Sequence, residues 1–286
     1  MKKFIINIAS FVFILLVINM VFYAITYKTY FKDYEKVGLT FTSYLLADSH
    51  GTPLNQLTQK LGIYNFSAAS DSYFDMLRKV KYLVKNTPVK QIIISVDDHS
   101  LSPYRENTNN LERSAFYMIK EDYDSIFTGG INSLKKYIVL FNPSIRGIIR
   151  SYLQSFIIKK TEMKQWSLLS KKQKHHNSKE RFNYQFDFTH PSIALTSSLE
   201  EIIDLCKISN IELIGIQFPL THIYYDTIKN NSFHADEIFR SHKLKVYDFR
   251  ELYLNHDEYF MNQDHLNLNG SKHFIDILTN SFAHPK

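Results

Sequence analysis

The chain has 286 residues, of which 44% are hydrophobic and 22% charged, and its formal net charge at neutral pH is +6. This length is enough for one sizeable domain with a well-buried core and some additions. Much of the positive charge lies in residues 159–182, a local run that is more typical of a solvated loop or helix face than of a nucleic-acid surface. We therefore expect no nucleic-acid partner. Cys206 is the only cysteine, so no internal disulfide is expected either.

An uncharged apolar stretch, residues 4–26, follows two lysines at the amino end. As a helix it could cross the roughly 30 Å of hydrocarbon in a bilayer. A cleaved signal peptide is the alternative, but its apolar core is usually about 7–15 residues long, and no clear small-x-small cleavage site follows here. We predict an uncleaved single-pass anchor at residues 1–27 and an extracytoplasmic domain at residues 28–286. Beside such an anchor, the basic run suits an anionic lipid headgroup or a surface polymer.

Short apolar runs bounded by turn residues predict buried strands of a parallel sheet. Amphipathic helical patterns lie between them, at residues 72–86 and 197–210, and a closing helix is expected from residue 269. Strands and helices in alternation predict an α/β fold whose sheet is covered on both faces. The expected strands are residues 41–47, 63–67, 91–96, 211–218 and 245–249.

Residues 101–191 break this alternation. They contain aromatic and basic residues, adjacent glycines at 129 and 130, and helical patterns at 131–141 and 145–160. We predict an insertion of helices and loops at the carboxyl end of the third strand, the edge of an α/β sheet where binding elements usually lie. Its aromatic residues are candidates for a sugar-stacking platform: Tyr104, Phe116, Tyr117, Tyr123 and Trp166.

Polar residues follow the first predicted strand directly, in the sequence Asp48-Ser49-His50-Gly51. Ser49 alone could be a helix cap, which is the role of most serines after strands. A serine at this edge of the sheet can also be a nucleophile, provided that a base and preorganised oxyanion donors surround it. The candidate base is His265, just before the closing helix.

The Asp48-Ser49 pair after an apolar strand, together with His265 in the sequence DHLNLNG, resembles the SGNH (GDSL-type) esterases and acyltransferases. The chain is more closely similar to their membrane-anchored relatives in surface-polymer modification, such as the alginate O-acetylation proteins and the D-alanine transfer protein of teichoic acid synthesis. The resemblance covers roughly residues 38–100 and 195–282. It implies a three-layer, flavodoxin-like α/β/α fold, Ser49 as nucleophile, His265 as general base and a covalent acyl-enzyme, without a cofactor.

The residue that orients the histidine departs from the family's pattern. The family's aspartate normally stands three residues before the histidine, and Asn262 occupies that place here. Asp264, directly before His265, is the candidate orienter, although it needs an unusual backbone path to reach the ring. A backbone carbonyl or Asp257 is the alternative.

The oxyanion donors depart from the pattern as well. The family's second glycine is replaced within the sequence FSAASDS, where Ala69 or Ser70 could still supply a backbone N–H. The third-block asparagine is absent, and His99 stands nearest to its place. The expected donors are therefore the backbone of Ser49, the segment at Ser70 and the ring of His99. A metal site at Asp97, Asp98 and His99 is an alternative, but no second cluster at recognisable spacing accompanies it, and we expect none.

The function expected from the sequence is a membrane-tethered O-acyltransferase or esterase that acts on a cell-surface carbohydrate. Such an enzyme could receive its acyl group from a membrane-bound partner. Two alternatives stay open: a non-catalytic scaffold or glycan-binding protein of the cell envelope with this fold, and an esterase that acts on membrane lipids.

Overall fold

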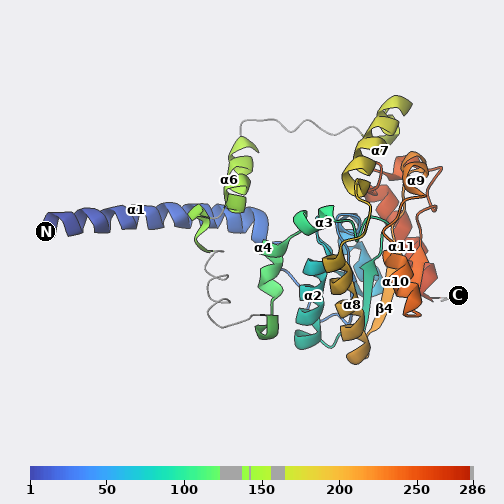
Figure 1. The fold of residues 1–286 in the computed structure, drawn as a ribbon, viewed down its shortest axis with the longest axis horizontal. Coiled ribbons are helices and arrows are strands. Elements are labelled where there is room, and N and C mark those ends of the chain that lie inside the picture. The colour runs from blue at the N-terminus through green and yellow to red at the C-terminus, as the bar shows by residue number, and fades with distance from the viewer. Residues whose placement is uncertain (123–136, 142, 156–164, 284–286) are drawn as a thin grey trace. The chain divides into compact units, whose positions relative to one another are not determined.

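The computed structural model describes residues 1–122, 137–141, 143–155 and 165–283 (Figure 1). This part of the chain divides into two compact units. Unit 1 comprises Met1–Lys36 and Glu112–Glu162, and unit 2 comprises Val37–Leu111 and Met163–Lys286. The predicted division into an anchor and an extracytoplasmic domain concerns the membrane and stays a prediction.

Unit 2 is built on a five-stranded parallel sheet. Its strand order is β2-β1-β3-β4-β5, the doubly wound order of flavodoxin-like folds, and helices lie on both sides. The predicted α/β class and all five predicted strands are confirmed. The strands are β1 (Ser43–Leu46), β2 (Ile63–Asn65), β3 (Gln91–Ser95), β4 (Glu212–Gln217) and β5 (Lys245–Asp248).

Helices fill most connections between the strands of unit 2. The predicted helix at 197–210 begins earlier, because the hydroxyl of Ser192 accepts the N–H of Leu195 and caps it there. The basic run, for which a loop and a helix were both open, forms a helix in its second half, α7. The helical segments are η2 (Thr52–Leu61), α2 (Tyr73–Asn86), α3 (Tyr104–Asn107), η6 (Trp166–Leu168), α7 (Lys171–Phe186), α8 (Ile193–Ile208), α9 (His222–Ile228), α10 (Ala235–Ser241), η7 (Asp257–Tyr259) and α11 (Leu268–Ala283).

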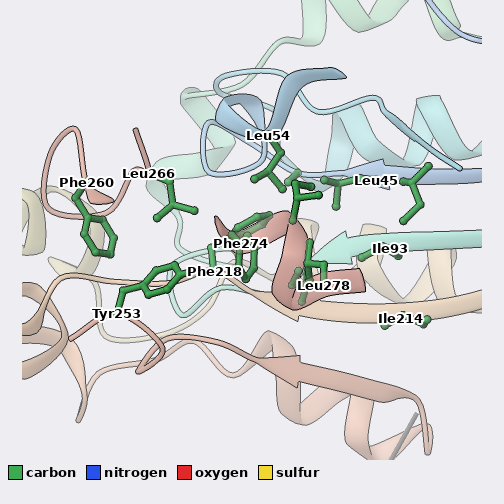
Figure 2. Close-up of a cluster of buried hydrophobic side chains, with 14 of the residues drawn as sticks. Leu45, Leu54, Ile93, Ile214, Phe218, Tyr253, Phe260, Leu266, Phe274 and Leu278 are labelled. Carbon is green, nitrogen blue, oxygen red and sulfur yellow. The ribbon is translucent and has the colours of Figure 1, made fainter. Parts of the chain in front are cut away.

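One face of the sheet is covered by α11. Leu45 of β1 pairs with Ile93 of β3, which pairs with Ile214 of β4, so these side chains lie side by side. Phe274 and Leu278 of α11 pack against them in one buried cluster (Figure 2). Each such side chain contributes about 1.5–3 kcal/mol when fully buried. This packing therefore fixes α11, and with it the turn that precedes α11, against the sheet.

Unit 1 contains the long apolar helix α1 (Lys2–Thr26), which continues through one π-helical turn, η1 (Tyr27–Phe31). Among the described residues it alone is long and apolar enough to cross a membrane, a property that signal sequences share. The expected apolar helix is present, whereas its retention and its orientation stay predictions. The later segments are α4 (Leu111–Ser114), η3 (Ala115–Tyr117), η4 (Lys120–Asp122), η5 (Val139–Phe141) and α6 (Pro143–Ser155). Residues 131–136 and 156–160 of the two predicted helical patterns lie outside the described residues.

Candidate active site

Three polar segments meet where the parallel strands of unit 2 end. Ser49 follows β1, His99 follows β3, and His265 precedes α11. The ring of His265 lies 4.8 Å, between centroids, from the ring of His50, the residue next to Ser49. The ring of His50 also lies 5.1 Å from that of His99. The structure thus brings residues from the first and last parts of unit 2 into one cluster, in which the catalytic roles of Ser49 and His265 stay predictions.

The turn before α11 brings the carboxylate of Asp264 against the imidazole of His265, the next residue in the chain. The Asn262 side-chain oxygen accepts the N–H groups of Asp264 at 3.2 Å and of His265 at 2.9 Å. This tight turn folds Asp264 back, and its Oδ1 lies 2.8 Å from Nδ1 of His265. Oδ1 of Asn262 lies 2.9 Å from the same nitrogen. Nδ1 of His265 therefore faces two oxygen acceptors and carries the proton, which leaves Nε2 free to act as a base.

Asp264 is fully buried and held by cations. Burial raises the pKa of this carboxyl, but the guanidinium of Arg181, whose Nε donates to Oδ2 at 2.8 Å, and the neighbouring His265 outweigh burial and hold the pKa well below its usual range. Arg181 comes from α7, in the basic run. Asp264 is thus ionised at neutral pH and can stabilise an imidazolium on His265.

His50 is a buried imidazole with carboxylates on both sides. Its Nδ1 lies 3.1 Å from Asp48 and 3.2 Å from Asp97, and its Nε2 lies 3.5 Å from Asp264. Burial lowers the pKa of His50, but Asp48, Asp264 and Asp97 outweigh burial and raise the pKa well above the usual value. The raised pKa favours the protonated form of His50, whose two ring nitrogens each lie within 3.5 Å of a carboxylate oxygen.

Asp48 joins the cluster to the end of β3. Its Oδ1 accepts the N–H of His50 at 2.9 Å, and its Oδ2 lies 3.1 Å from Nε2 of His99 and 3.5 Å from Arg105. Burial raises the pKa of Asp48, but His50, His99 and Arg105 outweigh burial and hold the pKa well below its usual range. Burial lowers the pKa of His99. A neutral His99 that donates Nε2–H to Asp48 has only Nδ1 left for a substrate, so its expected role as an oxyanion donor stays a prediction.

Ser49 is half-buried and its hydroxyl is not a helix cap. The following helical segment, η2, has Gly51 at its N-cap and no side-chain cap. Within the described ranges, neither the Ser49 hydroxyl nor Nε2 of His265 has a hydrogen-bond partner. The two groups are thus both free, but they are not hydrogen-bonded to each other in this structure; catalytic hydrogen bonds often tighten only when substrate binds.

Backbone N–H groups are available beside Ser49. Ala68 donates its N–H to the carbonyl of Ala47 at 3.1 Å, which holds the segment after β2 against the segment after β1. Ser70 then adopts a positive φ of 70°. In the part of the chain that the structure describes, no acceptor meets the N–H of Ser49, Ala69 or Ser70. These are the donors that a developing oxyanion requires.

The close approach of these two segments depends on Gly51. A Cβ atom there would lie 2.4 Å from Oγ of Ser67 and 2.7 Å from Cβ of Ala47. Asn65 of β2 donates its side-chain N–H to the Gly51 carbonyl at 2.8 Å, which ties the two segments together. A side chain at position 51 would therefore push the candidate nucleophile away from the candidate oxyanion donors.

Two groups of buried residues in this cluster have the ligand types and spacing for a metal ion: Asp48, His50 and His99, and His50, Asp264 and His265. The arginines argue against a bound metal ion, because Arg105 and Arg181 already neutralise Asp48 and Asp264. The charges balance without a metal ion, since three carboxylates face two guanidiniums and the His50 imidazolium.

Other candidates from the sequence lie in different surroundings. Asp257, the alternative orienter, accepts from Trp166 at 3.0 Å and from Lys174 at 2.7 Å. Asp98 forms an ion pair with Arg250 at 2.9 Å. Of the aromatic residues considered for sugar stacking, Tyr117 and Trp166 are fully buried, Tyr104 is nearly so, Phe116 is exposed, and Tyr123 lies outside the described residues. The buried rings cannot stack on a sugar.

No family model and no curated protein matches the chain. Three solved structures have a similar fold. A GDSL-like lipase from Bacteroides thetaiotaomicron is 9% identical, with 91% of this chain and 97% of that chain covered and a TM-score of 0.43. A protein assigned to the G-D-S-L lipolytic family, from Desulfitobacterium hafniense, is 12% identical, with 84% and 98% covered and a TM-score of 0.39. A protein assigned as an acylhydrolase, from Bacteroides fragilis, is 8% identical, with 91% and 98% covered and a TM-score of 0.42.

At identities of 8–12% and TM-scores of 0.39–0.43, these likenesses leave the activity to be argued from the site itself. Likeness to the membrane-anchored acyltransferases stays a prediction.

Proposed function

We propose that unit 2 is a serine acyl-ester enzyme in which Ser49 is the nucleophile, His265 the general base and Asp264 the residue that orients and charges His265. The observation that carries this proposal is the pair formed by Asp264 and His265, in which Oδ1 of Asp264 lies 2.8 Å from Nδ1 of His265. The ring of His265 lies beside the ring of His50, the residue that follows Ser49. A free hydroxyl, a free imidazole nitrogen and three unpaired N–H groups at one sheet edge are the parts that acyl transfer requires.

In the proposed mechanism, Oγ of Ser49 attacks the acyl carbonyl while Nε2 of His265 takes its proton. Asp264 accepts the hydrogen bond from Nδ1 throughout and stabilises the imidazolium. The N–H groups of Ser49 and of the segment at Ser70 stabilise the oxyanion of the tetrahedral intermediate, which collapses to the acyl-enzyme as His265 returns the proton to the leaving alcohol. Water or an acceptor hydroxyl, deprotonated by His265, then attacks the acyl carbonyl, and His265 returns that proton to Oγ of Ser49 as the bond between the acyl group and Oγ breaks.

We propose a cell-surface carbohydrate as the substrate, with an O-acyltransferase or esterase reaction. The support is the resemblance of the Asp48-Ser49 and His265 motifs to enzymes of that class, together with the apolar helix α1. The same helix also favours a second candidate, an esterase of membrane lipids, because it would hold unit 2 close to them. A membrane-bound acyl donor belongs to the first candidate only.

The test of the mechanism uses the full chain in detergent micelles and a fluorophosphonate probe, which labels activated serines. We expect labelling of the wild type and of Ser70→Ala, which keeps its backbone N–H, and no labelling of Ser49→Ala or His265→Ala. Hydrolysis of an aryl acetate should follow the same pattern. Labelling of Ser49→Ala at the wild-type rate would end the assignment of the nucleophile. If the folded wild type neither labels nor hydrolyses any ester, the non-catalytic alternative stands.

The test of the substrate compares three products in one assay. The protein is incubated with an acyl donor and an oligosaccharide, with an acetylated oligosaccharide alone, and with phospholipid vesicles, and mass spectrometry reads the products. Gain of one acyl group by the oligosaccharide identifies a transferase, and loss of one identifies a glycan esterase. Release of fatty acid with no change of either oligosaccharide identifies the lipid esterase and contradicts the carbohydrate substrate.

A further inference from the structure

The apolar helix of unit 1 has one polar residue whose side chain is engaged by a distant segment. The Asn19 side chain donates to the carbonyl of Tyr137 at 2.7 Å and accepts the N–H of Leu140 at 3.4 Å. The ring of Tyr137 also lies 5.3 Å from the ring of Tyr23, one turn further along α1. Both hydrogen-bonding functions of the Asn19 amide are thus satisfied by backbone groups more than 110 residues away in the chain.

The position of Asn19 in α1 places this contact at membrane depth. A span of about 30 Å takes about 20 residues, so a span that begins at Phe4 ends near Tyr23. Asn19 then lies about 6 Å inside the hydrocarbon, at 1.5 Å per residue. An amide there is costly unless it is paired, because lipid offers no hydrogen bonds. Residues 137–141 supply these bonds, and the side chains of Tyr137 and Ile138 beside them are exposed.

The helix that follows, α6, is amphipathic. Its Ile145 and Ile149 are buried with Phe31 and Val139, packed against the end of α1 and the η1 turn. Arg146 and Arg150, each one residue further along, are exposed, and so is Leu153. Helices that lie in a membrane interface have these features: apolar residues four positions apart, basic residues next to them, and exposed apolar side chains such as leucine.

The surroundings of α6 point to the same location. Three tyrosines pack around its cluster, Tyr23 of α1 and Tyr27 and Tyr30 of η1, and tyrosine is enriched where membrane meets water. Lys28 and Lys32, one turn apart, are exposed on the same stretch. Together with Arg146 and Arg150 they give this end of unit 1 four exposed basic side chains, which favours anionic headgroups.

We propose that residues 137–141 and 143–155 form a second membrane contact of this protein: Tyr137 and Ile138 enter the hydrocarbon beside Asn19, and α6 lies in the interface on anionic phospholipid. This assignment makes α1 a permanent part of unit 1, because a chain cleaved after α1 would lose the partner of residues 137–149. The proposal is independent of the chemistry proposed for unit 2.

The test uses the full chain reconstituted in vesicles, with Cys206→Ala as background and single cysteines labelled with an environment-sensitive fluorophore. We expect the label at Ile138→Cys to show apolar emission, to be quenched by nitroxides on lipid acyl chains, and to be shielded from aqueous iodide. Ile208→Cys in unit 2, where the side chain is 83% exposed, is the matched control and should be quenched by iodide. Equal iodide quenching at both sites would overturn the proposal.

Two further variants test the parts of the contact. With a label at Leu153→Cys, transfer from neutral vesicles to vesicles with about one third phosphatidylglycerol should shift the emission to the blue. Arg146→Gln/Arg150→Gln should reduce that shift, whereas the control Lys90→Gln/Lys207→Gln should not. In Asn19→Leu, α1 stays inserted, but the label at 138 should become accessible to iodide.

An unchanged lipid response in the double arginine variant would contradict anionic headgroups as the partner, and an unchanged label in Asn19→Leu would contradict the anchoring by Asn19. The intact mass of the protein extracted from membranes shows whether residues 1–31 are retained. A chain that retains residues 1–31 supports the proposal, and one that has lost them overturns it.

Discussion

The two units keep polar groups away from water in opposite ways. Unit 2 buries three carboxylates at the end of its sheet and surrounds them with cations, so the charges are matched inside protein. Among the described residues of unit 1 no charged side chain is fully buried, and α1 exposes a row of large apolar side chains from Phe4 to Val21, with Asn19 bonded to backbone groups.

The difference shows what each unit is built to meet. A buried network of ions is costly to assemble and is found where chemistry requires fixed charges. A long exposed apolar helix is suited to an apolar solvent, where an amide such as that of Asn19 is costly unless it is paired. On the two proposals made above, unit 2 is organised around a reaction and unit 1 around a bilayer. Removing charges from unit 2 should accordingly affect both activity and folding.

The largest effect is expected from Asp264→Asn. It removes the charge that stabilises the His265 imidazolium, and it leaves Arg181 and Nε2 of His50 facing a neutral amide. We expect kcat/KM for aryl acetates to fall about 10²–10⁴-fold, since the corresponding change in a serine protease triad costs about 10⁴-fold and Asn262 still accepts from Nδ1 here. The free energy of unfolding should fall by about 3–5 kcal/mol, measured by urea titration of the fluorescence of Trp166, the only tryptophan.

Asp257→Asn is the matched control, because Asp257 pairs with Lys174 and Trp166 away from His265. It should leave kcat/KM within a few fold of the wild type. Wild-type kcat/KM in a folded Asp264→Asn protein would remove Asp264 from the mechanism.

An intermediate effect is expected at Asn262, whose side-chain oxygen holds the turn. Asn262→Ala loses acceptors for two backbone N–H groups, so we expect a loss of about 1–3 kcal/mol of stability. Asn262→Asp keeps the acceptors and adds a second carboxylate against Nδ1, which should stabilise the imidazolium form of His265 in this variant. The acid limb of the kcat/KM profile should then move up by about one pH unit. A profile unchanged in Asn262→Asp would show that His265 is not the titrating base.

The sequence predicted that Ser49 and His265 share one edge of the sheet, for reasons that hold in any parallel sheet. Apolar runs fixed the strands, and residues at the carboxyl ends of such strands share one edge. Its failures at this site have tertiary causes. Nothing in the sequence showed that His50 belongs to the buried cluster, where Asp48 accepts its backbone N–H and Asp48 and Asp97 lie beside its ring. Arg181 resembled one more solvated residue of a basic run, and only the packing of α7 on α9 brings it to Asp264.

The sequence predicted Asp264 as the residue that orients His265, but it did not predict the backbone turn that lets this carboxylate reach the ring. The signal was present in the sequence at Asn262, because asparagine commonly bonds to backbone N–H groups two residues on and so creates a tight turn. Two acceptors, Asn262 and Asp264, therefore occupy the place where the family's pattern has one. No such local rule would have found the Asn19 contact, since its partners are backbone groups of a segment far along the chain.

The smallest effect is a pH dependence of stability that belongs to His50. The pKa of His50 is raised in the folded protein above its unfolded value of about 6.5. Its charge therefore stabilises the fold fully below about pH 6.5, and this contribution is lost as the pH rises through the folded pKa. We expect His50→Gln to lower the free energy of unfolding more at pH 6 than at pH 9, by about 1–2 kcal/mol.

The matched control for that measurement is His242→Gln. His242 is a half-exposed histidine of unit 2 that pairs with Glu200 at 2.8 Å, so it has the same chemistry at the surface. Solvent screens this pair, and we expect its effect on unfolding to stay below about 1 kcal/mol and to differ little between the two pH values. If His50→Gln behaved in the same way, the imidazolium between the buried carboxylates would contribute no more than a surface ion pair, and the contrast between a unit organised by charge and a unit organised by lipid would lose its central element.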